Sequence, residues 1–136
     1  MTVLIQFRSA SPRPASRREV GPAADPHGFT RILMDGALER IEAAREQFLE
    51  GGPAERRRLL QATLLLVGEL RAELDLREGG TIAANVDDLY DYIIRRLKAA
   101  DMANGSAALA EVSHLLEALR AAWPFMPAEV RAAPRN

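Results

Sequence analysis

The densest group of residues that could do chemistry is DDLYDY, residues 87–92, which contains three aspartates and two tyrosines. Neighbouring carboxylates can act as general acid and general base when their surroundings move their pKa values apart. At helical spacing, however, these acids fall on the polar side of a helix, where Asp91 can pair with Arg95 four residues later. We therefore expect a solvated, charged helix face and no acid–base site.

No other catalytic or metal-binding pattern is visible. His27 and His114 lie on different segments, and His114 has no second ligand three or four residues away, so we expect no metal site. Ser106 and Ser113 lack the Gly-x-Ser-x-Gly context of a nucleophile, and residues 79–81 (GGT) lack the spacing of a phosphate-binding loop. The chain has no cysteine, which excludes thiol chemistry. We expect a protein that is not an enzyme and needs no cofactor.

Composition points to one globular domain. The chain has 136 residues, 48% hydrophobic and 27% charged, with a net charge of −1. That balance gives no attraction to nucleic acid, and we interpret the run Arg56–Arg58 as a solvated end of a helix bundle. No stretch is long and apolar enough for a membrane span, so we expect no membrane insertion and a cytoplasmic (cytosolic) location.

Prolines and glycines divide the chain into four helical segments. Ala, Leu, Glu and Arg dominate each segment, and apolar residues recur in each at helical spacing. Because the connections are short, neighbouring helices must run antiparallel. We predict an all-α fold, an antiparallel up-down-up-down four-helix bundle with a mobile N-terminal segment. The predicted helices span residues 27–50, 54–78, 81–103 and 106–123.

The ends of the chain differ from its middle. Residues 1–25 include a stretch rich in Arg, Pro, Ser and Ala, so we expect a flexible or loosely docked segment. Residues 26–123 form the predicted bundle. The helix cannot continue past Pro124, and residues 124–136 are expected to be a C-terminal tail.

The second helix carries more apolar surface than one core can use. In LLQATLLLVGEL, Leu60 and Leu64 widen the apolar stripe, while Leu65 points away from its centre. On the first helix Ile32 is similarly misplaced, and Leu38 flanks the stripe. Several spare apolar residues on adjoining helices favour a groove for an amphipathic helix, or a self-association face. Covering of these residues by the N-terminal segment is an alternative that the sequence leaves open.

The two tyrosines point in opposite directions on the third helix. Tyr90 falls in the middle of the apolar stripe, where it can fill core volume and bring its hydroxyl to a partner. Tyr92 falls almost opposite, among charged residues, and can pack under an arginine.

Several motifs resemble one known family. The run LYDYIIRRLKAADMANGSAALAEVSHLLEALRAAW, Leu89 to Trp123, is similar to the C-terminal half of the flagellar export chaperone family FliS, which reads LYDY, RRL, a polar turn and LLxxLRxAW. Residues 24–38 (ADPHGFTRILMDGAL) resemble its first-helix signature, and residues 74–92 its turn into the third helix. Met34 replaces a usual tyrosine, and the tyrosine-containing head of the family is missing.

The resemblance implies an ATP-independent chaperone with the fold predicted above. It would bind the disordered C-terminal segment of flagellin, prevent premature polymerisation, and deliver flagellin to a component of the type III export gate. The departures leave open whether the N-terminal segment regulates access, as in the family. The alternatives are another small helical type III export chaperone or adaptor, and a self-associating helical bundle such as a homodimer.

We predict that six residues border the flagellin surface, and that Gly36 and Gly68 allow a partner helix to approach closely. For two of the six, Leu60 and Ile94, an ordinary core position is an equal alternative. The six residues are Leu38, Leu60, Leu64, Leu65, Tyr92 and Ile94.

Overall fold

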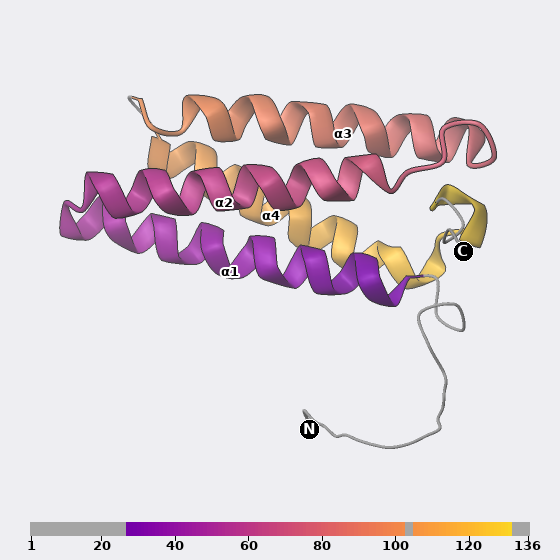
Figure 1. Ribbon diagram of the computed structural model, residues 1–136, viewed down its shortest axis with the longest axis horizontal. Helices are drawn as coiled ribbons and strands as arrows, with labels where there is room; N and C mark the ends of the chain where they lie inside the picture. Colours follow the sequence, from indigo (N-terminus) through magenta and orange to yellow (C-terminus); the bar gives the residue numbers. More distant parts are fainter. Residues whose placement is uncertain (1–26, 103–104, 132–136) are drawn as a thin grey trace, which may run out of the picture.

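Four long helices make up most of the computed structural model, which describes residues 27–102 and 105–131 (Figure 1). Two short 3-10 turns, η2 and η3, follow the last helix. The all-α bundle expected from the sequence is confirmed, whereas the predicted mobile segment, residues 1–25, lies outside the described residues. The elements are α1 (Gly28–Glu50), α2 (Pro53–Ala72), α3 (Gly80–Ala99), α4 (Gly105–Ala122), η2 (Trp123–Phe125) and η3 (Ala128–Val130).

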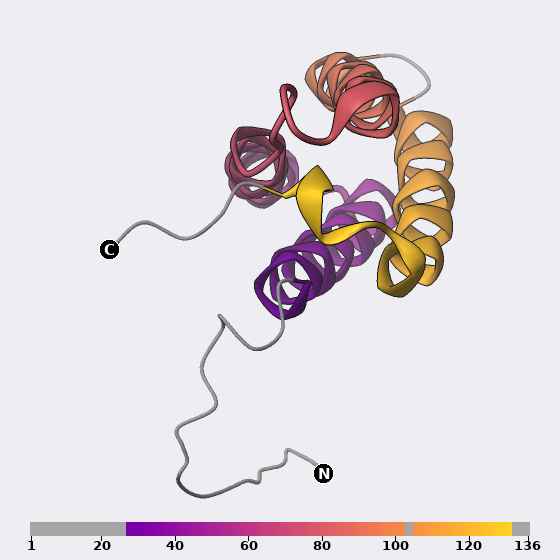
Figure 2. The same cartoon turned by 90° about the vertical axis from the view of Figure 1, so that its right-hand side faces the viewer.

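The helices form a closed square in which each one packs against its neighbours in sequence, and α1 also packs against α4 (Figure 2). Gly51 makes the first reversal: its φ of 73° lies in the left-handed region that glycine favours, and its N–H donates to the carbonyl of Gln47. Pro53 then starts α2 at a position where a missing N–H costs nothing. Short turns of this kind keep consecutive helices antiparallel.

One apolar core runs along the axis of the square. Each helix contributes a stripe at helical spacing, for example Ile41 from α1 and Val112 from α4, both fully buried. The largest buried side chains are Tyr90 of α3 and Trp123, the first residue after α4. Burial of these stripes is the main force that holds the four helices together.

The second helix is shorter than the sequence predicts. The predicted segment runs to residue 78, but α2 ends at Ala72. The reason is a tight turn around Asp75, whose carboxylate accepts hydrogen bonds from the backbone N–H groups of Arg77 (3.1 Å) and Glu78 (2.9 Å). Aspartate favours such a turn over a helix because its short side chain competes for backbone donors.

The chain returns to the bundle after Pro124. We name residues 123–131 the C-terminal strap; it runs from the end of α4 across the end of the bundle to α2 (Figure 2). The N–H of Asp75 donates to the carbonyl of Val130 at 2.8 Å, and the Val130 side chain is fully buried. The sequence predicts a tail here and gives no sign of this docking.

The Tyr90 hydroxyl does not make the contact with a partner that the sequence suggests. The ring occupies the core as predicted, but the hydroxyl is buried and has no hydrogen-bond partner among the described residues. Burial raises the pKa of Tyr90 well above its ordinary value, because the charged phenolate would lie in apolar surroundings. The aromatic ring, and not a polar contact, is what Tyr90 contributes to the core.

We predict that Tyr90→Phe keeps or raises the free energy of unfolding, by at most about 1–3 kcal/mol, since it removes an unsatisfied buried hydroxyl. Tyr90→Ala should lower it by about 3–5 kcal/mol, the usual cost of deleting a buried aromatic ring. Urea denaturation of the three proteins measures both effects. A loss of more than about 1 kcal/mol in Tyr90→Phe would mean that the hydroxyl is satisfied after all.

Candidate partner-binding groove

A shallow apolar groove runs along α2 beside α3. It consists of two adjoining hollows of about 310 and 230 Å³ that share Gln61 and Leu64. Leu65 completes the first hollow, while Leu60 and Leu97 supply the apolar part of the second. We name these five residues the α2/α3 groove.

The groove follows from the excess of leucines on α2. Leu60 and Leu64, one turn apart, lie on the shoulder of α2, and Leu65 points outward. Leu60 is only 4% exposed, Leu64 is half-buried and Leu65 is 75% exposed, so the groove slopes from core to surface. Three residues after Leu65, a side chain added at Gly68 would meet nothing within 4 Å. The surface beside the leucines is therefore open to an approaching helix.

Gly36 has a different environment from Gly68. A Cβ atom at Gly36 would lie 3.4 Å from Cδ1 of Leu66. Its missing side chain therefore serves the packing of α1 against α2. Of the two glycines predicted to admit a partner, only Gly68 has space beside it.

Ion pairs tie α2 to α3 at one end of the groove. Asp101, just after α3, accepts from Arg56 (2.9 Å) and from Arg57 (2.9 Å). The hydrogen bond from Arg57, followed by that from Arg56, holds the pKa of Asp101 below its ordinary value, since both favour the charged carboxylate. Arg56 also lies over the Phe48 ring, 4.4 Å from its centroid. Two of the three arginines of the run 56–58 thus clamp the bundle end, a role that the sequence does not reveal.

A second set of ion pairs crosses from α2 to the acidic stretch of α3. Arg71 contacts Asp87 at 2.7 Å and Asp91 at 3.3 Å, and Arg95 contacts Asp91 at 3.1 Å, as the four-residue spacing predicts. Hydrogen bonding to Arg95 lowers the pKa of Asp91. These carboxylates are structural partners of arginine. Within residues 27–102 and 105–131, no group of His, Asp or Glu could hold a metal ion.

The six predicted contact residues lie on three different sides of the bundle. Leu60, Leu64 and Leu65 lie in the α2/α3 groove. Ile94, which packs against the core, lies on the same side of α3, because it is one turn from Asp91, which pairs with Arg71 of α2, and one turn from Lys98, which lines the groove.

Leu38 and Tyr92 face elsewhere. Leu38 follows Asp35 by three residues, and Asp35 pairs with Arg120 of α4, so Leu38 lies on the α4 side of α1. The Tyr92 hydroxyl donates to Glu111 of α4 at 2.8 Å. Arg95 lies over the Tyr92 ring at 5.7 Å, as expected for a tyrosine packed under an arginine.

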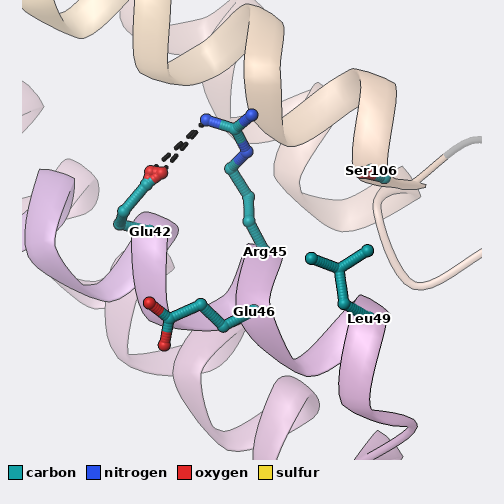
Figure 3. Close-up of a pocket in the computed structure, with 5 residues that line it drawn as sticks. All are labelled: Glu42, Arg45, Glu46, Leu49 and Ser106. Carbon is teal, nitrogen blue, oxygen red and sulfur yellow. Dashed lines mark hydrogen bonds and ion pairs between the residues drawn. The ribbon is translucent and has the colours of Figure 1, made fainter.

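A further hollow of about 290 Å³ opens between α1 and α4 (Figure 3). Its lining includes Leu49, which is 89% exposed, and Ser106 near the start of α4. Arg45 reaches from α1 toward α4 and pairs with Glu42 at 3.1 Å (Figure 3). The sequence analysis does not predict this hollow. The position of Leu49 outside the apolar stripe of α1 indicates an exposed apolar side chain there.

The histidines take no part in these grooves. His114 is exposed on α4, as the sequence suggests. The Nε2–H of His27 donates to the carbonyl of Met126 at 2.9 Å, and its ring meets the edge of Trp123 at 5.7 Å between centroids. His27 therefore joins the start of α1 to the C-terminal strap.

Comparisons with known proteins agree on one family. The profile of the family described as flagellar protein FliS matches residues 11–129. Flagellar secretion chaperone FliSB of Pseudomonas aeruginosa is 38% identical over 100 residues, 74% of this chain and 79% of the relative. Flagellar secretion chaperone FliS of Salmonella typhimurium is 41% identical over 103 residues, 74% and 76% of the two chains. The protein of that name from Vibrio cholerae is 32% identical over 108 residues, 79% of each.

These relatives are named as chaperones and not as enzymes, in agreement with the absence of a catalytic pattern in the sequence. Among the helices that the structure describes, none combines the length and the apolar character needed to cross a membrane.

We predict that Asp101→Asn lowers the melting temperature by a few degrees at pH 7, the effect of losing about 1 kcal/mol of ion pairing. The folded-state pKa of Asp101 lies below its unfolded value, so the pairing stabilises the fold above about pH 4 and is lost as the pH falls through the folded-state pKa. The difference between wild type and variant should therefore shrink below about pH 4. Thermal melts from pH 7 to pH 3 measure it; a constant difference would contradict this role of Asp101.

Proposed function

Because this chain belongs to the flagellar protein FliS family, we propose that it binds the disordered C-terminal segment of flagellin and delivers it to the flagellar type III export gate. The names of the relatives support the general role, since each is called a flagellar secretion chaperone. The activity takes place in the cytosol, before export, and involves no catalysis.

The main observation that supports the α2/α3 groove as the binding surface is the exposure of Leu65 beside half-buried Leu64. A segment that is disordered alone can fold into an amphipathic helix on such a groove and bury its apolar stripe there. It must lose conformational freedom on binding, which makes the complex releasable despite its large apolar contact. Covering the segment blocks its use in filament assembly until export.

The six predicted residues fit a partner that wraps around the bundle. Leu38, Tyr92 and the leucines of the α2/α3 groove lie on three sides of the square, so one straight helix cannot contact all of them. A long disordered segment can fold piecewise over several grooves. We take the α2/α3 groove as the primary contact, because Leu65, which lies in it, is the most exposed of the six residues.

The exposed leucines also suit self-association, which is the competing function. A homodimer would bury Leu65 against a second copy and compete with the peptide. Sedimentation of the free protein between micromolar and millimolar concentration separates the two ideas. Peptide binding at concentrations where the chain is monomeric supports the chaperone.

We predict that the double variant Leu64→Gln, Leu65→Gln weakens binding of a flagellin C-terminal peptide by about tenfold or more, since each buried leucine contributes about 1.5–3 kcal/mol. Helix content and melting temperature should stay near the wild-type values, because neither side chain is fully buried. Isothermal titration and circular dichroism measure the two properties.

Leu49→Gln is the matched control. Leu49 is 89% exposed on α1 and lines neither hollow of the groove. It should bind the peptide as wild type does. Equal affinity of the double variant and this control would refute the α2/α3 groove as the binding surface.

A further inference from the structure

The C-terminal strap holds the connection between α2 and α3 in place. Val130 lies under the connection, where its carbonyl accepts the N–H of Asp75 at 2.8 Å and its side chain is fully buried. Leu74 and Arg131 form an antiparallel bridge beside this bond. A Cβ atom at Gly79 would lie 3.0 Å from Cα of Val130, so a glycine at this position lets the two backbones approach.

The same strap also contacts the start of α1. Arg131 pairs with Glu73 at 2.9 Å, and its guanidinium lies 5.6 Å from the centroid of the Phe29 ring. Met126 accepts the hydrogen bond from His27 described above. The strap thus joins the N-terminal end of α1, the C-terminal end of α2 and the connection into α3.

After Trp123, two side chains of the strap are largely buried: Val130 and Arg131, whose side chain is 8% exposed. Val130 is the one fully buried apolar side chain after Trp123 in the described chain, whereas Phe125 is 86% exposed. Short 3-10 turns with few buried contacts belong to the parts of a protein that open locally at low cost. The hydrogen bond to Asp75 and the bridge to Leu74 join backbone groups, which can exchange these contacts for water when the strap leaves.

The docked strap opposes the separation of α2 and α3, the two helices that border the α2/α3 groove. Leu60, in the floor of the groove, is only 4% exposed, so we infer that a partner helix contacts it fully only after α2 and α3 move apart. The ion pairs of Asp101 oppose that movement at one end of the groove. At the other end of the two helices, the connection held by Val130 opposes it.

We propose that the C-terminal strap is a displaceable latch: docked, it keeps the α2/α3 groove narrow, and it must leave the connection before the groove can take a partner helix in full. This inference rests on the proposed function of the groove. The docked strap lowers the apparent affinity for the partner, because only the released fraction of the protein is fully competent to bind.

A disulfide tests the latch directly. The chain contains no cysteine, so Leu74→Cys with Arg131→Cys introduces a single pair. Residues facing each other across an antiparallel bridge have Cα atoms about 4.5–5.5 Å apart, which is within the range for a disulfide. The oxidised protein, with bond formation confirmed by mass, should bind the flagellin peptide about tenfold more weakly than the same protein after reduction. Both forms lack the Arg131–Glu73 pair, so the difference between them reports the effect of the disulfide alone.

Weakening the latch should have the opposite effect. Val130→Ala removes two methyl groups from under the connection and should raise the affinity for the peptide about threefold or more. Val112→Ala removes the same groups from the buried face of α4 and is the control for general loosening of the core; its affinity should stay at the wild-type value. Amide exchange at Asp75 should be faster in Val130→Ala than in Val112→Ala.

Two results would overturn the latch: equal affinity of the oxidised and reduced proteins, or no gain of Val130→Ala over Val112→Ala. Either result leaves the groove assignment intact if Leu64→Gln, Leu65→Gln still loses binding. If wild type does not bind the peptide at all, the proposed function itself fails, and the latch fails with it.

Discussion

The structure depends on the burial of one apolar stripe from each helix in a single core, and α2 has more apolar surface than that core can cover. Burial of Ile41, Tyr90 and Val112 fixes the rotation of α1, α3 and α4 about their axes. With Val67 of α2 also fully buried, Leu64 and Leu65 are left on its outer shoulder. The groove is therefore a direct consequence of core formation, since no rotation of α2 could bury all of its leucines.

Charged residues join the two helices that border this groove. Asp101 joins the start of α2 to the end of α3 through Arg56 and Arg57, and the strap holds the opposite end. Arg71 crosses between the two helices. A chaperone needs such a balance, because a groove that is permanently wide would expose its leucines to self-association, and a rigid one would reject a helix.

Helical periodicity predicted the fold well because each apolar stripe is long and regular. The exposure of Leu65 and the packing of Tyr92 beneath Arg95 also follow from position on a helix. Contacts between distant residues could not be predicted in this way. The strap depends on Val130 meeting Asp75, and the clamp on Asp101 meeting Arg56; single residues far apart in sequence carry no periodic signal. The family resemblance supplied the partner, which the physics of a spare apolar surface leaves unnamed.

The most direct test is nuclear magnetic resonance of leucine methyl groups during titration with the flagellin C-terminal peptide. If the α2/α3 groove is the binding surface, the methyl signals of Leu64 and Leu65 should shift, while those of Leu49, which is 89% exposed on α1, stay unchanged. Unshifted signals from Leu64 and Leu65 at saturating peptide would contradict the account, even if the peptide bound elsewhere on the bundle.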